Sequence, residues 1–107
     1  RCTIAVGEKL VCVLSLGYGA TQGIAHKSKP METLCQVEGA MPDWFRKGMK
    51  AAMLAPTAMN QQKFLISLSG SAVTAKSLGG FYSKVDLGIV KYHFETGAGK
   101  ENFIWAK

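Results

Sequence analysis

The pattern of apolar and polar positions divides the chain into stretches of helical and of extended character. The most continuous apolar stretch, residues 10–16, has the length and composition of a strand that is buried on both faces of a sheet. Two further extended stretches, residues 64–68 and 73–77, flank the polar turn 69–72, which predicts a β-hairpin. A mixture of strands and helices with at least one hairpin predicts an α+β fold.

One longer helix is predicted before the hairpin. It opens at Pro42, a first-turn position that proline tolerates, and it ends near Ala55 because Pro56 disfavours helical geometry in the residue before it. Small side chains recur on this helix at three- and four-residue spacing, which indicates close approach to another element or to a cofactor. The positions on this face are Trp44, Gly48, Ala51, Ala52 and Ala55.

A second longer helix is predicted after the hairpin. It begins at Ser83, because Asp86 three positions later completes a pattern that resembles a capping box, and it ends at Gly97 and Gly99. Its apolar side consists of Val85, Ile89, Tyr92 and His93, beside Val90 and Phe94. Shorter elements complete the pattern, namely a helix within residues 30–37 and a final strand at residues 103–105.

Length and composition exclude several classes of protein. The 107 residues suffice for one domain, residues 1–107, with a modest core. With 48% hydrophobic and 19% charged residues, the chain has the composition of a globular protein rather than of a disordered one. No apolar run approaches the ~20 residues of a membrane span, and no signal peptide is visible, so no membrane partner is expected. Residue 1 is Arg rather than Met, which indicates a fragment or a processed product.

Charge and cysteine usage narrow the expected partners and compartment. The net charge is +6, but the basic residues are scattered without a Lys or Arg run or an aromatic RNA-binding motif, so nucleic acid is not an expected partner. The three cysteines, Cys2, Cys12 and Cys35, are odd in number and form no CxxC pair, which favours neither a zinc site nor a disulfide framework. Cys12 lies in the apolar run and is interpreted as a small core residue. This usage is typical of the reducing cytoplasm.

The connection after Pro56 is the first candidate for chemistry. Polar side chains on this connection offer hydrogen-bond donors and acceptors next to the exposed end of an apolar helix, namely those of Thr57, Asn60, Gln61 and Gln62. Two interpretations stay open on these residues alone. The side chains could satisfy the last helical carbonyls and make turns, or they could hold a flat ligand with polar edges.

Residues 55–62, Ala-Pro-Thr-Ala-Met-Asn-Gln-Gln, resemble the Ala-Pro-Ser/Thr-x-x-Asn-x-Gln signature of the FMN-dependent nitroreductase family. In that family the loop lies against the flavin ring, usually from the partner half of a dimeric site. A Pro follows the Gln in many members, whereas here Gln62 and Lys63 follow. The residues that the resemblance places along the flavin ring are Pro56, Thr57, Ala58, Asn60 and Gln61.

A basic loop at Lys27, Ser28 and Lys29 is the second candidate. Two ammonium groups and a hydroxyl suit a phosphate dianion, although such a loop alone is only weakly indicative. The loop is similar to the nitroreductase pattern in which an apolar strand ends in Gly-Tyr-Pro and a Lys-x-Arg pair downstream reaches the FMN phosphate. Gly19 stands where many members have Pro, and Lys29 where many have Arg. The ammonium group of Lys29 therefore acts as a point charge, whereas the guanidinium group of an arginine would bind the phosphate through two parallel hydrogen bonds.

A third and less specific resemblance lies in the last helix, which begins near an Asp-x-Gly and ends at a Gly-x-Gly turn. Gly88 would allow this helix to pack closely, as at the dimer core of the family. The order of the features, with Gly17-Tyr18 before the Pro56 loop, resembles a nitroreductase subgroup that has two nitroreductase-like halves in one chain. Residues 1–107 would then be a C-terminal half, and they lack the Arg-x-Ser-x-Arg phosphate motif of the family.

The resemblance implies an FMN-dependent oxidoreductase that uses NAD(P)H to reduce nitroaromatic or quinone-type acceptors. Such an enzyme requires no protein nucleophile, because the flavin carries the electron pair. Self-association or pairing with the other half would complete its site. The alternative is a fragment that retains the fold and acts only as a non-catalytic association module.

Overall fold

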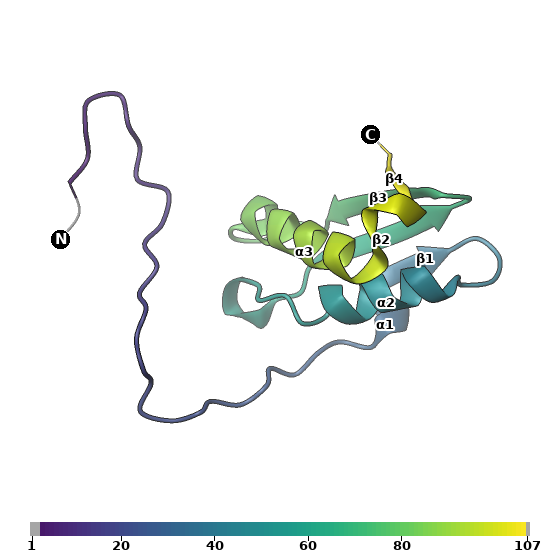
Figure 1. Ribbon diagram of the computed structural model, residues 1–107, viewed down its shortest axis with the longest axis horizontal. Helices are drawn as coiled ribbons and strands as arrows, with labels where there is room; N and C mark the ends of the chain where they lie inside the picture. The colour runs from purple at the N-terminus through teal and green to yellow at the C-terminus, as the bar shows by residue number, and fades with distance from the viewer. Residues whose placement is uncertain (1–2, 107) are drawn as a thin grey trace.

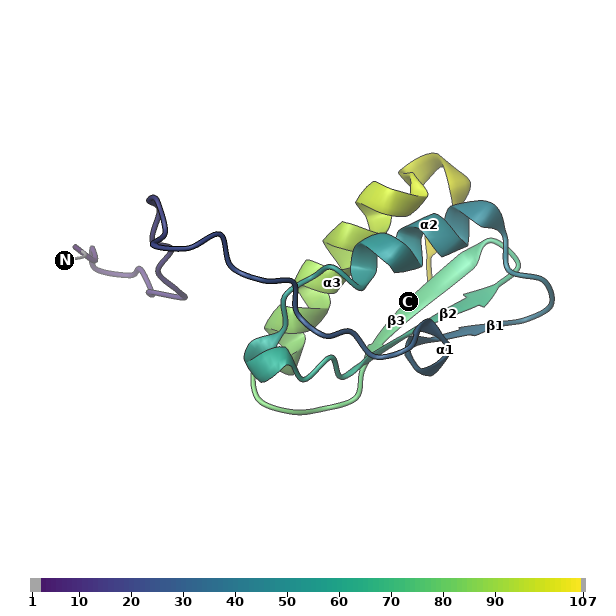
Figure 2. The ribbon, with the colours of Figure 1, turned by 90° about the horizontal axis from the view of Figure 1, so that it is seen from below.

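The computed structural model describes residues 3–106, and Arg1, Cys2 and Lys107 lie outside the described part. Two helices, α2 and α3, cover one face of a four-stranded sheet, while residues 3–25 form an extended arm outside the sheet (Figures 1 and 2). The helices and strands are α1 (Met31–Leu34), β1 (Cys35–Val37), α2 (Asp43–Ala52), β2 (Phe64–Ser69), β3 (Ala72–Ser77), α3 (Ser83–Ala98) and β4 (Ile104–Trp105). Two 3₁₀ turns, η1 (Ala58–Asn60) and η2 (Lys100–Asn102), complete the order. The α+β prediction is confirmed.

The sheet has the strand order β1-β2-β3-β4 and mixes both pairing types. β1 pairs with β2 in parallel, β2 with β3 antiparallel, and β3 with β4 in parallel. The antiparallel pair is the predicted hairpin, and Gly70 supplies the positive φ (63°) that its tight turn favours. Along β2, buried side chains at Phe64, Ile66 and Leu68 alternate with more exposed ones, because successive side chains of a strand point to opposite faces.

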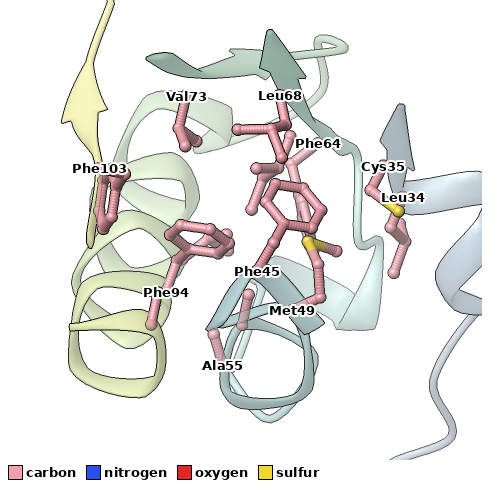
Figure 3. Close-up of a cluster of buried hydrophobic side chains, with 14 residues drawn as sticks. Leu34, Cys35, Phe45, Met49, Ala55, Phe64, Leu68, Val73, Phe94 and Phe103 are labelled. Atoms are coloured by element: carbon pink, nitrogen blue, oxygen red, sulfur yellow. The ribbon is translucent and has the colours of Figure 1, made fainter. Parts of the chain in front are cut away.

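The core lies between the sheet and the two long helices (Figure 3). Phe45 of α2 and Phe94 of α3 are fully buried, and their ring centroids lie 5.4 Å apart in an edge-to-face arrangement. Phe103 packs edge-on against Phe94 at 5.3 Å and carries this aromatic contact toward β4. Aromatic pairs in such geometry bury large areas and add specific attraction, so they fix the helices against the sheet.

Two glycines set the close approach of α2 to α3. A Cβ placed on Gly48 would lie 2.6 Å from the ring of Phe94, and one on Gly97 would lie 2.6 Å from Cβ of Ala51. The predicted small face of the first helix is therefore confirmed as a helix–helix contact. Around Gly88, by contrast, nothing lies within 4 Å of the position of a Cβ, so the close packing expected there is not made within this chain.

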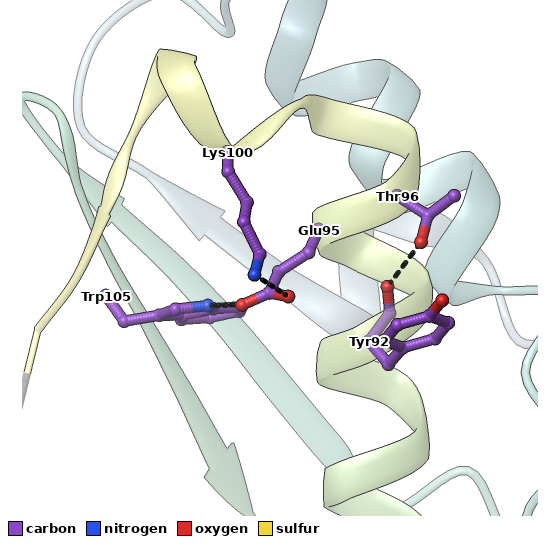
Figure 4. Close-up of polar contacts among 5 residues, drawn as sticks. All are labelled: Tyr92, Glu95, Thr96, Lys100 and Trp105. Atoms are coloured by element: carbon purple, nitrogen blue, oxygen red, sulfur yellow. Dashed lines mark hydrogen bonds and ion pairs between the residues drawn. The ribbon is translucent and has the colours of Figure 1, made fainter.

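Side-chain contacts with α3 fix the C-terminal strand (Figure 4). The indole N–H of Trp105 donates to the carboxylate of Glu95, and Lys100 Nζ lies 3.7 Å from the same carboxylate. Lys91 Nζ lies 4.7 Å from the centroid of the Trp105 ring. The final strand predicted near residues 103–105 is confirmed as β4.

The predicted buried strand at residues 10–16 is wrong. Within residues 3–106 the stretch has no strand partner, and its apolar side chains face solvent, with Leu14 and Leu16 91% and 103% exposed. Cys12 is exposed as well, so its interpretation as a core residue is also wrong. A strand becomes buried only when neighbouring strands and a covering layer are present, and the described part of this chain places neither beside the arm.

Two details of α3 also differ from prediction. The helix begins at Ser83, but no capping box forms, because Tyr82 occupies the N-cap position without a side-chain cap bond and the carboxylate of Asp86 reaches a different element. The buried face is the neighbouring one, which consists of Asp86, Val90, Phe94 and Ala98. Positions four apart share the face that meets α2 and the sheet. Val85 and Tyr92 lie outside this face and are 53% and 70% exposed.

The other two helices each begin directly after a proline, and their C-terminal ends come earlier than predicted. α2 ends at Ala52, a little before the predicted position, and the residues up to Pro56 form a turn in which the Leu54 amide donates to the Ala51 carbonyl at 3.0 Å. The predicted helix within residues 30–37 is only one turn long, and β1 follows it directly. None of the helices within residues 3–106 is long and apolar enough to cross a membrane.

Candidate functional site

The loop between α2 and β2, residues 56–62, has an unusual backbone. Met59, Asn60 and Gln62 have φ angles of 50°, 54° and 49°, in the left-handed region that residues other than glycine rarely adopt. Each such residue costs about 1–3 kcal/mol when the conformation is strained, so surrounding contacts must hold it. Two sets of hydrogen bonds, one on each side of the loop, meet this requirement.

Gln62 holds the loop on one side. Its side chain is buried, at 5% exposure, and its amide nitrogen donates to the Lys27 carbonyl at 2.8 Å and to Asn60 Oδ1 at 2.9 Å. Its Oε1 accepts the Lys29 amide at 2.8 Å, while its own backbone N–H donates to Thr57 Oγ1 at 3.1 Å. A buried amide with both ends bonded is stabilising, whereas a buried amide without partners would be costly.

These bonds join the two segments that the sequence singled out. Asn60 Nδ2 also donates to the Lys27 carbonyl, at 3.1 Å. A ring nitrogen of His26 lies 2.9 Å from the Met53 carbonyl, and the Ser28 hydroxyl donates to that carbonyl at 3.3 Å. The basic loop therefore lies along the C-terminal end of α2 and against the Pro56 loop, although the bonded residues are 25–35 positions apart in sequence.

The basic loop leaves its two lysine side chains exposed to solvent. The ion pairs among the residues described are Asp43–Lys47 and Glu95–Lys100, so neither Lys27 nor Lys29 is neutralised by a carboxylate within residues 3–106. Ser28 differs, because its single hydroxyl proton is directed at the Met53 carbonyl. In this arrangement, two ammonium groups are available to an anion and the Ser28 hydroxyl is not available as a donor.

Asp86 and Gln61 hold the loop on the other side. The carboxylate of Asp86, at 9% exposure, accepts the Ala58 amide at 3.0 and 3.1 Å, one distance to each oxygen. The Gln61 side-chain amide donates to Asp86 Oδ2 at 2.8 Å and to the Phe81 carbonyl at 2.6 Å. Asp86 lies in the first turn of α3, where the positive end of the helix dipole favours a carboxylate.

An apolar surface adjoins this second set of bonds. Phe81 and Tyr82 are more than half exposed, and their ring centroids are 4.0 Å apart. A cavity of about 360 Å³ lies beside them, within the size range of small-molecule sites. Its lining consists of Val11, Cys12, Ala58, Tyr82, Val85 and Asp86. Met59, at 83% exposure, and the exposed Pro56 extend this apolar surface along the loop.

The described residues show binding groups rather than an acid–base pair. His26 and His93 each place a ring nitrogen within hydrogen-bond distance of a backbone carbonyl, that of Met53 and that of Ile89. Burial raises the pKa of the Cys35 thiol, and the nearby Glu32 carboxylate raises it further, so this thiol is held neutral beneath α1.

The sequence does not predict the roles that two residues of the site have in the structure. Gln62 is among the polar side chains that the sequence indicates in this loop, but the residues expected along the ring include Gln61 instead, although Gln62 is the residue that follows Asn60 at the Asn-x-Gln spacing. That spacing was a usable signal. Asp86 was assigned to a local cap, and no local signal indicates that its carboxylate would accept the amide of Ala58, 28 positions away.

Comparison with known proteins adds family evidence to this geometry. Residues 1–98 match the protein family described as "Putative TM nitroreductase". Among solved structures, the chain is similar to the crystal structure of a protein from Thermotoga maritima described as a "putative nitroreductase", with a TM-score of 0.60 and 28% sequence identity. The similarity covers 73% of this chain and 35% of that chain, so this chain spans about a third of the length of its solved relative. Among curated proteins, none matches the chain.

Proposed function

The chain belongs to the TM nitroreductase family, and from this premise we propose that it forms part of an FMN-dependent NAD(P)H oxidoreductase that reduces nitroaromatic or quinone-type acceptors. The observation that carries the proposal is the joining of the basic loop to the Pro56 loop through the buried amide of Gln62. When bound, the flavin supplies the chemistry of electron-pair transfer. The residues of this chain bind and orient it.

The phosphate end of FMN fits the basic loop in part. Lys27 and Lys29 offer two exposed ammonium groups on a backbone that Gln62 fixes. Ser28 does not fit in the arrangement observed, because its hydroxyl donates to Met53 at the C-terminal end of α2. We propose that the two lysines attract the phosphate and that Ser28 joins them only if its bond to Met53 is exchanged for one to the ligand.

The ring end of FMN fits the exposed side of the Pro56 loop. Pro56 is exposed and Ala58 is half-buried, and together they offer a small, apolar surface to the flat face of a ring. The hydroxyl oxygen of Thr57 accepts a hydrogen bond from the backbone N–H of Gln62, which leaves the hydroxyl proton of Thr57 for the edge of the ring. The amides of Asn60 and Gln61 are bonded within the protein, so we propose that they shape the wall more than they contact the ring.

We propose that a second polypeptide segment completes the site. The arm exposes the apolar residues of stretch 10–16, a composition that monomers seldom leave in solvent. Self-association or pairing with another nitroreductase-like half would cover it. The order of the two loops supports the interpretation of residues 1–107 as one domain that corresponds to a C-terminal half. We also propose that it works in the cytoplasm without nucleic-acid or membrane partners.

Titration of FMN with the chain tests the proposal. Binding quenches flavin fluorescence, and we expect the double variant K27Q/K29Q to weaken FMN binding about tenfold or more, because each charge-assisted bond to phosphate contributes about 1.5–3 kcal/mol. Riboflavin, which lacks the phosphate, should bind wild type and variant alike. The control K47Q/K50Q removes the same charge from exposed positions on α2.

Two outcomes would contradict parts of the proposal. If K27Q/K29Q weakens riboflavin and FMN binding equally, the lysines do not hold the phosphate. If wild type quenches neither flavin, also after mixing at concentrations where the chain self-associates, the chain acts as an association module rather than as a flavin-binding one.

A further inference from the structure

The strained turn η1 is capped by a residue from a distant element. Ala58 is the first residue of η1, so its amide is one of the donors that a helical turn leaves without an internal partner. A residue just before a helix usually supplies the cap, but Thr57 makes no side-chain cap bond here. Asp86 of α3 supplies it instead, with both carboxylate oxygens within 3.1 Å of the Ala58 nitrogen.

Gln61 adds a second bond between α3 and the loop. Its amide nitrogen donates both to Asp86 Oδ2 and to the Phe81 carbonyl, so the side chain links the loop to the start of α3. Gly80 makes room for this side chain, because a Cβ there would lie 2.5 Å from Gln61 Oε1. The φ of Gly80, 103°, also requires glycine.

We infer that Asp86 is a positioning residue that holds the Pro56 loop in its strained, ligand-ready shape. It acts through the backbone amide of Ala58 and the side chain of Gln61. Gln62 holds the opposite side of the loop, so the left-handed residues between these two anchors keep one conformation. The identification of the ligand as FMN rests on the function proposed above, whereas the positioning of the loop does not.

A purely structural role for Asp86 would concern α3 alone. A carboxylate in the first turn of any helix interacts favourably with the helix dipole, and Asp43 in the first turn of α2 is an exposed example. Asp86 differs from Asp43 in being buried and in accepting three close contacts from the loop. The variant D43N is therefore a suitable control, because it removes the same charge from the first turn of a helix at a residue that pairs with Lys47 and not with the loop.

Amide hydrogen exchange measured by NMR on the free chain tests the inference. We expect the Ala58 amide to exchange about tenfold faster in D86N than in wild type, and faster still in D86A, because a charge-assisted bond is weakened and then removed. The side-chain amide signals of Gln61 should shift in both variants. D43N should leave the Ala58 and Gln61 signals unchanged.

FMN titration of the same variants supplies a second readout. We expect the FMN dissociation constant to rise about tenfold in D86N and to stay within about twofold of wild type in D43N. Unchanged Ala58 exchange in folded D86A would overturn the inference. A wild-type chain that binds no flavin would instead contradict the proposed function and leave the exchange result to decide the inference.

The variant G80A decides the case if D86N and D86A fail to fold. It leaves the carboxylate in place but displaces the Gln61 amide. The expected result is a shift of the Gln61 side-chain signals together with faster exchange at Ala58. If both remain as in wild type in a folded protein, Asp86 and Gln61 do not hold the loop.

Discussion

At the residue scale, buried polar side chains decide the shape of the candidate site. Gln62 and Asp86 are buried, and both direct their polar atoms at the backbone of the loops rather than at solvent. Hydrogen bonds of this kind contribute modestly when made, but a buried partner left without its bond costs about 1–3 kcal/mol. The loop is therefore more sensitive to these two residues than to its exposed side chains.

The first prediction concerns Gln62. Replacing it by Leu keeps most of the volume but leaves the Lys29 amide and the Lys27 carbonyl without this partner, so we expect Q62L to lower the free energy of unfolding by about 1–3 kcal/mol. Urea denaturation measures the change. Q36L, at an exposed position of β1, is the control and should stay within about 0.5 kcal/mol of wild type. Equal stability of Q62L and Q36L would contradict the importance of the Gln62 contacts.

The second prediction concerns the pH response of Cys35. Burial and the Glu32 carboxylate raise the pKa of this thiol, so the fold favours the neutral form. The resulting stabilisation is fully present below the ordinary thiol pKa of 9.0 and is lost as the pH rises through the higher value of the folded state. The rate at which the Cys35 thiol of the folded protein is alkylated should therefore still rise above pH 9.0. Mass spectrometry of the peptide that contains Cys35 measures this rate. A rate that levels off below that pH would show that the thiol is not shifted upward.

At the scale of elements, glycine positions determine how α2 and α3 meet. Gly97 lies against Ala51 of α2, whereas Gly88, nine positions earlier on the same helix, is exposed and has open space around it. The sequence marked both glycines on this helix but not the difference between them. That difference depends on which side of α3 faces α2, and the sequence predicted the neighbouring side.

The third prediction uses this pair of glycines. We expect G97A to destabilise the protein by about 1–3 kcal/mol, because the added methyl would lie 2.6 Å from Ala51 Cβ and from the Lys47 carbonyl. G88A should stabilise it by about 0.5–1 kcal/mol, since alanine lowers the conformational entropy lost in a helix and here meets no neighbour. Thermal unfolding of the two variants compares them directly. Changes of the same sign would contradict the observed helix packing.

At the scale of the whole molecule, the arm leaves apolar side chains exposed that a fold complete in itself would cover. The sheet and helices form a continuous core, and no residue before Met31 packs in it among the residues that the structure describes. Residues 10–16 nevertheless have the composition of a buried strand, and they are extended and exposed. An exposed extended apolar segment readily pairs with another chain, because its backbone groups and its side chains both lack partners.

The fourth prediction concerns assembly. We expect the chain to form species larger than its 11.5 kDa mass in a concentration-dependent way, and we expect L14K/L16K to shift it toward the monomer. Size-exclusion chromatography with light scattering measures the mass. The control T21K/Q22K adds the same charge at exposed positions of the arm outside the apolar stretch. A monomeric wild type at high concentration would contradict a role of the arm in self-association.

The sequence by itself determined what depends on neighbouring residues. The hairpin, the start of α2 after Pro42 and the glycine end of α3 follow from turn chemistry, helix signals and periodicity within a few positions of the chain. The resemblance of residues 55–62 and the basic loop to one family was likewise visible without a structure. These features are local, so their physical causes are contained in short stretches of sequence.

Only the tertiary structure decided which distant groups meet. It brought the basic loop onto the Pro56 loop through Gln62, turned Asp86 from a local cap into a partner of Ala58, and left residues 10–16 without a sheet. A hydrogen-bond partner 25–35 positions away is chosen by how the helices pack on the sheet, and burial of a strand is chosen by which neighbours exist. Neither choice is encoded in the residue types of a single segment.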